Sequence, residues 1–130
     1  MTSHRILQLN AISTAACAVG MLAARGVLPA LFGLDGPALL DLLAVGLLAY
    51  AGMLAGAANR RPVTRQALLA FTVADVLWVV ASAIVLLLFW PEFAAIARFL
   101  VIVVALVVEV FATLQFLAAG KASGGRPQVA

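Results

Sequence analysis

The fold is decided by residues 66–90, which read QALLAFTVADVLWVVASAIVLLLFW. An α-helix needs about 20 apolar residues to cross a bilayer, so this run is long enough to span a membrane with some tilt. Its one charged residue is Asp75. An acid at the centre of a transmembrane helix costs roughly 2.5–3.5 kcal/mol on insertion scales, so such residues usually have a function. The stretch therefore predicts a transmembrane helix that carries a functional acid.

Three further apolar runs of similar length predict three more spans. They cover about residues 6–24, 38–58 and 93–119. The connections between the runs are short, and Thr64 is a suitable N-cap for the 66–90 helix. We therefore predict an all-α fold, a four-transmembrane-helix antiparallel bundle with short loops. It forms a single domain over residues 1–120, followed by a disordered cytoplasmic tail over residues 121–130.

Composition and charge support a membrane protein. The chain has 130 residues, 66% of them hydrophobic and 10% charged, and a soluble chain of this length could not bury so much apolar surface. The net charge of +3 does not indicate nucleic-acid binding, because the basic residues flank the spans. Six of the eight fall on the side of both termini: Arg5, Arg60, Arg61, Arg65, Lys121 and Arg126. The positive-inside rule then places both termini in the cytoplasm. We expect the membrane to be a bacterial inner membrane.

Polar residues inside the spans predict a shared polar cluster. A helix rises about 1.5 Å per residue, so Asp75, Glu109 and Tyr50 all lie roughly 13–15 Å from the cytoplasmic helix ends. By the same count, Asn10 and Gln115 form a second, shallower layer. Trp78 follows Asp75 by three residues and shares its helix face. Asp75 and Glu109 are therefore predicted to face each other or a common cavity.

No Lys or Arg lies deep in the spans near these two acids, because Arg98 falls near the non-cytoplasmic end of its run. Burial of unpaired carboxylates favours the neutral form, so at least one is predicted to be protonated at neutral pH. The cluster has three interpretations. It fixes helix register by hydrogen bonding, it forms a proton or cation relay, or it is part of a pocket for a lipid-like ligand walled by Trp78 and Tyr50.

The sequence contains no motif for catalysis or cofactor binding. His4 is its one histidine, so a bis-histidine haem site within the chain is excluded, and Cys17 is its one cysteine. No nucleophile–base pair, metal-binding motif or Gly-rich phosphate loop is present. We therefore expect neither enzymatic activity nor a cofactor.

Small residues predict close helix packing. Gly52 and Gly56 are four residues apart on the second predicted helix, a spacing that lets helices approach closely. We expect this pair to pack inside the bundle, and a homodimer face is the alternative.

The layout resembles small four-span bacterial membrane proteins of unassigned function. The resemblance rests on Asn10, the stretch from Gly46 to Tyr50, the run 75–78 and Gln115, and it covers about residues 4–119. It implies a fold and no activity. Small multidrug transporters are similar in length and span count, but their essential glutamate lies in the first helix, where this chain has Asn10.

These observations predict a non-enzymatic accessory or binding bundle in the membrane. It would engage a lipid-like ligand or a membrane protein partner through its protonatable polar cluster. The alternative is a small proton-coupled transporter that works as a homodimer. Membrane lipids are expected partners in both cases.

Overall fold

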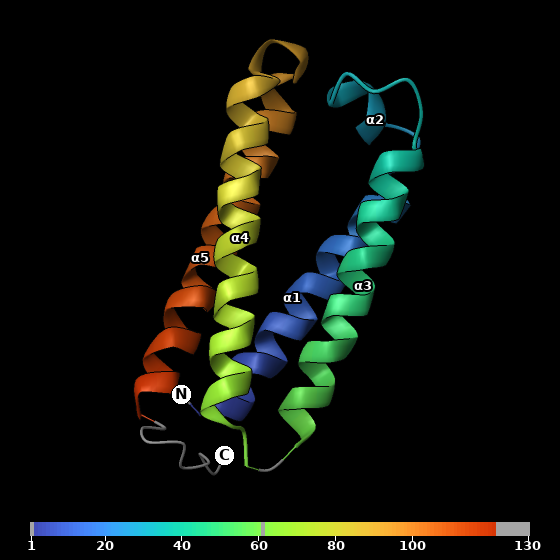
Figure 1. The fold of residues 1–130 in the computed structure, drawn as a ribbon. Coiled ribbons are helices and arrows are strands. Elements are labelled where there is room, and N and C mark those ends of the chain that lie inside the picture. The colour runs from blue at the N-terminus through green and yellow to red at the C-terminus, as the bar shows by residue number, and fades with distance from the viewer. Residues whose placement is uncertain (1, 61, 122–130) are drawn as a thin grey trace.

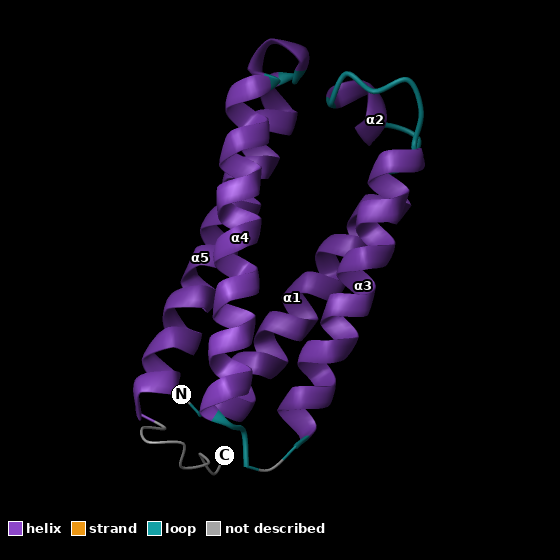
Figure 2. Cartoon of the chain, in the orientation of Figure 1, coloured by secondary structure: helices purple, strands orange, loops and turns teal. Residues whose placement is uncertain are grey.

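The computed structural model describes residues 2–60 and 62–121, and four long helices dominate it (Figure 1). Each is long and apolar enough to cross a membrane: α1 (Ser3–Ala23), α3 (Ala38–Asn59), α4 (Arg65–Leu88) and α5 (Ala95–Lys121). Two short elements connect them, α2 (Leu28–Leu31) and the 3-10 turn η1 (Trp90–Glu92). Helices and loops make up the described chain in Figure 2. The predicted four-helix bundle is confirmed, and the chain is a small multi-pass membrane protein.

The helix boundaries agree with the sequence signals. The Thr64 side chain caps α4 by accepting a hydrogen bond from the Ala67 backbone N–H at 3.1 Å, so this predicted N-cap is confirmed. Helix α5 continues to Lys121, two residues beyond the predicted end of the fourth span, which places Lys121 in the helix rather than in the tail. The rest of the predicted tail, including Arg126, lies outside the described residues, as does Arg61.

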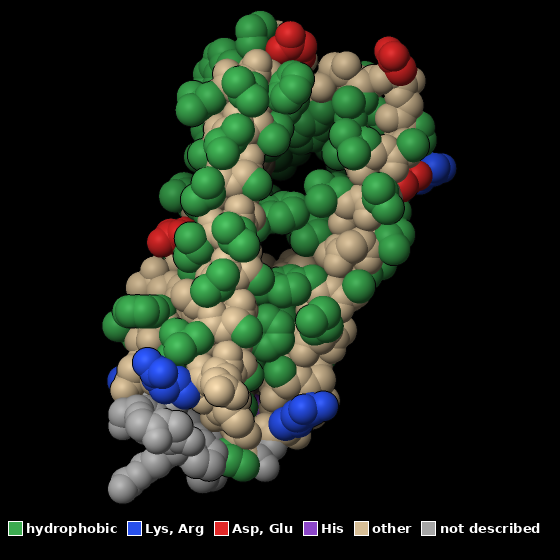
Figure 3. Space-filling view, in the orientation of Figure 1, with side chains coloured by type: hydrophobic (Ala, Val, Ile, Leu, Met, Phe, Trp, Pro, Cys, Tyr) green, Lys and Arg blue, Asp and Glu red, His purple; other side chains and the backbone are tan. Residues whose placement is uncertain are grey.

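The start of α1 and the end of α5 lie at the same end of the bundle, which we call the terminal end (Figure 1). The loop between α3 and α4 lies there too, whereas α2 and η1 lie at the opposite, distal end. Basic side chains gather toward the terminal end on the face shown in Figure 3. The assignment of the terminal end to the cytoplasm stays a prediction.

The four long helices form two hairpins. Helix α1 packs along α3, α4 packs along α5, and the hairpins meet mainly where α1 contacts α5. The hydrophobic core lies in the terminal half and includes the fully buried Leu7, Leu54 and Leu68. On α4 the buried residues end at Asp75, and the thirteen residues from 76 to 88 bury none. The bundle is therefore packed at its terminal end and open between the hairpins toward its distal end.

A second contact joins the hairpins at the distal end. The Ala94 backbone N–H donates to the Leu31 carbonyl at 2.8 Å, and the Phe32 and Phe93 rings meet edge-on with centroids 5.0 Å apart. Gly33, just after α2, has φ +70° and packs against Glu92. The hairpins thus touch at both ends and leave a space between them.

Gly33→Ala is expected to destabilise the protein by about 1–2 kcal/mol, the cost of a left-handed conformation for a residue with a Cβ. A Cβ at Gly33 would also lie 2.9 Å from the Glu92 carbonyl oxygen, which is closer than real contacts allow. Unfolding in detergent micelles measures the change. Gly36→Ala is the matched control, because a Cβ there meets nothing within 4 Å. Equal stability of the two variants would contradict the assignment of this contact.

The prediction of internal packing for Gly52 and Gly56 is wrong. Both are exposed on α3, and a Cβ on either would meet no atom within 4 Å. The inward face of α3 is instead set by Ala51, Leu54 and Ala58, which are buried. A four-residue spacing shows that two residues share a helix face but not which face turns inward.

Candidate functional site

Asp75 lies at the centre of a buried hydrogen-bond cluster. Its Oδ1 accepts from the Tyr50 hydroxyl at 2.7 Å, and its Oδ2 accepts from Asn10 Nδ2 and Gln115 Nε2, both at 3.0 Å. Only 3% of Asp75 is exposed. The donors come from α3, α1 and α5, so this one carboxyl group connects all four long helices.

Two further contacts extend the cluster. Asn10 Nδ2 also donates to Gln115 Oε1 at 2.7 Å, and the Thr14 hydroxyl donates to Asn10 Oδ1 at 3.2 Å. We call these five residues the polar cluster: Asn10, Thr14, Tyr50, Asp75 and Gln115. Among the described residues, Asp75 has no ion-pair partner; the one salt bridge joins Arg25 to Asp41. The polar cluster therefore contains a carboxylic acid that has no basic side chain as an ion-pair partner among the described residues.

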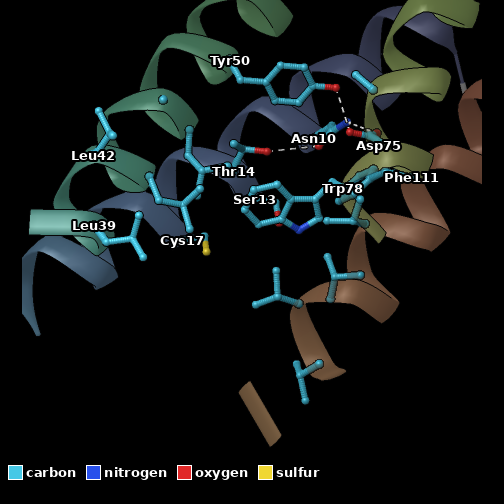
Figure 4. Close-up of a pocket in the computed structure, with 18 residues that line it drawn as sticks. Asn10, Ser13, Thr14, Cys17, Leu39, Leu42, Tyr50, Asp75, Trp78 and Phe111 are labelled. Atoms are coloured by element: carbon cyan, nitrogen blue, oxygen red, sulfur yellow. Dashed lines mark hydrogen bonds between the residues drawn. The ribbon is translucent and has the colours of Figure 1, made fainter. Parts of the chain in front are cut away.

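A cavity of about 630 Å³ lies between the hairpins and adjoins the polar cluster (Figure 4). Pockets for small molecules typically measure about 300–1,000 Å³. Four members of the polar cluster line it, all except Gln115. Its walls are apolar and come mainly from α3 and α5: Leu39, Leu42, Leu43, Leu47, Val103, Val104, Val107, Val108 and Phe111. The cavity thus combines apolar walls with a polar floor.

Trp78 reaches into this cavity from α4 (Figure 4). Its indole Nε1–H is buried and has no hydrogen-bond partner among the described residues. A buried donor without an acceptor costs about 1–3 kcal/mol, and native structures contain few of them. Trp78 therefore lines the cavity and carries a buried donor that has no acceptor among the described residues.

The cavity opens sideways rather than toward a bundle end. Figure 3 shows a hollow surrounded by hydrophobic side chains between the α4 and α3 columns. Leu39 and Leu42, on the α3 side of the cavity, are 60% and 70% exposed. Because α3 and α4 are both long enough to span a membrane, a mouth between them faces the hydrocarbon of the bilayer.

Glu109 does not belong to the polar cluster, and the prediction that it faces Asp75 is wrong. It is exposed, and its carboxyl group contacts no donor or base among the described residues. Glu109 precedes Gln115 by six residues, which places it about 120° away around α5. Counting residues gives depth along a helix but not the direction in which a side chain points.

The predicted separation into two layers is also wrong, since Asn10 and Gln115 bond directly to Asp75. Side chains tilt toward the N-terminus of their own helix. Helices α4 and α5 run in opposite directions, so Asp75 leans toward the terminal end and Gln115 toward the distal end. The two side chains therefore meet although their backbone positions differ in depth.

Glu109→Leu is expected to make membrane insertion of α5 more favourable by about 3 kcal/mol, because the unpaired acid faces the lipid. A glycosylation-mapping assay of α5 insertion measures this effect. Val110→Leu is a suitable control, since Val110 is also exposed and its replacement leaves charge unchanged. An insertion efficiency that does not rise would show that Glu109 has a partner in the membrane.

The sequence indicated part of this site. Asn10, Tyr50, Asp75, Trp78 and Gln115 were identifiable as polar or aromatic groups inside spans, and the structure brings all five to the cavity or its floor. The wall residues of α3 and α5 carried no signal, because a leucine or valine facing a cavity resembles one facing lipid.

The sequence matches no protein-family model, no curated protein and no solved structure. Among residues 2–60 and 62–121, no group of three His, Cys, Asp or Glu side chains is placed to hold a metal ion. His4 lies elsewhere, where its Nδ1 donates to the Ala58 carbonyl and connects α1 to α3. The function is therefore inferred from the polar cluster and the cavity.

Proposed function

We propose that this protein is a non-enzymatic membrane protein that binds an amphipathic, lipid-like molecule in the cavity between its two hairpins. The observation that carries the proposal is the combination of apolar walls, a polar floor and a mouth toward the bilayer. A molecule with an apolar chain and one polar end matches this arrangement. The proposal places the protein in a bacterial inner membrane with both termini in the cytoplasm.

The polar floor would supply most of the selectivity. Lipid tails are as apolar as leucine, so moving an alkyl chain from the bilayer into the cavity gains little by the hydrophobic effect. A polar group at membrane depth, by contrast, has almost no hydrogen-bond partners outside a protein. The Asp75 region and the Trp78 N–H supply such partners, so the polar end of the ligand would determine which molecule binds.

One observation favours binding over proton-coupled transport, and another supports a non-enzymatic role. A transporter needs access to Asp75 from both sides of the membrane, in alternation. Toward the terminal end, however, the polar cluster adjoins a packed core in which Leu7, Leu54 and Leu68 are fully buried. The floor side chains are also bonded to one another rather than arranged as a nucleophile and base, which supports a non-enzymatic role. A partner membrane helix is the alternative occupant of the cavity.

Fluorescence quenching of Trp78 tests the proposal. The chain has two tryptophans, so Trp90→Phe leaves Trp78 as the reporter. Dodecanol brominated on its chain is expected to quench Trp78 saturably in lipid nanodiscs. The matched protein Trp78→Phe reports Trp90, which is 42% exposed at the distal end and should show weak, non-saturating quenching. Equal quenching curves for the two proteins would refute the cavity as a binding site.

A further inference from the structure

The lining of the cavity floor has used its donor hydrogens within the polar cluster. Thr14 donates to Asn10, Tyr50 donates to Asp75, and the Asn10 amide donates to both Asp75 and Gln115. Acceptor capacity remains, because hydroxyl and carboxylate oxygens each accept about two hydrogen bonds. Asp75 Oδ1 accepts only from Tyr50 among the described residues, and the Thr14 and Tyr50 oxygens accept from none. The polar end of an occupant that donates hydrogen bonds therefore finds free acceptors at the polar cluster, whereas the donors that remain in the lining, on Ser13 and Trp78, lie outside this cluster.

The charge of the floor narrows the choice of donor. Asp75 has no Lys, Arg or His partner among the described residues, and opposite charges attract strongly in a low-dielectric interior. An amine and a carboxylic acid form a net-neutral pair wherever the proton resides. The cavity also contains the aromatic side chains Tyr50, Trp78 and Phe111, and aromatic faces attract cations.

We propose that the ligand of this cavity is an amphiphilic amine, with its amino group at Asp75 and its alkyl chain between α3 and α5. This inference rests on the proposed function and specifies its ligand class. Trp78 is three residues distal to Asp75, about 4.5 Å farther along α4. In this proposal its unpaired N–H would donate to an oxygen close to the amine, as in a long-chain amino alcohol.

Competitors that share one alkyl chain and differ in the polar end test the ligand class in wild-type protein. Dodecylamine, dodecanol and dodecanoate compete with the brominated dodecanol probe in nanodiscs of zwitterionic lipid. Dodecylamine is expected to bind about tenfold more tightly than dodecanol, as a charge-assisted hydrogen bond would provide, and dodecanoate should bind most weakly. Dodecyltrimethylammonium has the charge but no N–H, so it should bind more weakly than dodecylamine.

Variants of Asp75 and Glu109 test which of these two acids causes the preference for the amine. Asp75→Asn should reduce the preference for amine over alcohol to near unity, whereas Glu109→Gln, which removes the exposed acid, should leave it unchanged. The same lipid in every sample keeps the partitioning of each competitor equal between wild type and variants, so a change in the preference reports on the protein.

The outcomes separate this inference from the proposed function. Equal binding of amine and alcohol, or an amine preference that survives Asp75→Asn, would overturn the ligand class while leaving the cavity as a binding site. Failure of every competitor and of the probe to bind would overturn both. If Asp75→Asn does not fold, the comparison of dodecylamine with dodecyltrimethylammonium decides in wild-type protein, since equal affinity would contradict a donor at the floor.

Discussion

Asp75→Leu is expected to lower the free energy of unfolding by about 3–5 kcal/mol. The leucine removes the acceptor of three hydrogen bonds and leaves the Asn10 and Gln115 amides with buried, unpaired N–H groups. Tyr50 loses less, because its hydroxyl lies 3.4 Å from the Phe71 carbonyl and can donate there instead. Titration with denaturing detergent, followed by circular dichroism, measures the loss.

Asp75→Asn tests whether the stability loss of Asp75→Leu comes from the lost hydrogen bonds, because asparagine has a similar size and keeps an acceptor oxygen. Its amide oxygen can accept from Asn10 and Gln115 while its N–H donates to the Tyr50 oxygen, so the expected loss is about 1 kcal/mol. Glu109→Leu serves as the control for removing an acid, and its unfolding free energy should change by less than about 0.5 kcal/mol because Glu109 is exposed. Similar losses for the two Asp75 variants would contradict the role of Asp75 as the shared acceptor.

Gly46→Phe is expected to weaken amphiphile binding by about a hundredfold, because the aromatic ring would occupy the space of the ligand. Gly46 lines the cavity one helical turn from Tyr50, and a Cβ there would meet no atom within 4 Å. The backbone at Gly46 can therefore accept a Cβ without a clash. Its stability should be unchanged or rise by up to about 1 kcal/mol, since glycine disfavours helix interiors.

Gly52→Phe is the matched control for this blocking experiment. Gly52 is on the same helix and is exposed, a Cβ there also meets nothing within 4 Å, and it does not line the cavity. The two variants share the gain in helix propensity and the added aromatic ring, so they differ only in position. Native mass spectrometry of released nanodiscs counts bound amphiphile without relying on Trp78. Undiminished binding in Gly46→Phe would place the ligand somewhere other than the cavity.

The sequence by itself determined the four spans, their order and the placement of the start of α1 and the end of α5 at one end of the bundle. These features depend on the lengths of apolar runs, and the need to satisfy backbone hydrogen bonds within the membrane makes each such run a helix. The sequence also indicated that Asn10, Tyr50, Asp75 and Gln115 are unusual inside spans. Local composition is sufficient for such predictions because each concerns one helix at a time.

Only the tertiary structure decided which polar groups meet and where a cavity forms. It brought Asn10 and Gln115 to Asp75 and turned Glu109 outward, because helix rotation and tilt set side-chain direction and residue counts do not. It also placed Val103 and Leu42 beside a cavity rather than only beside lipid. These residues look the same in sequence because lipid and a protein cavity are equally apolar, so only the packing of one hairpin against the other distinguishes them.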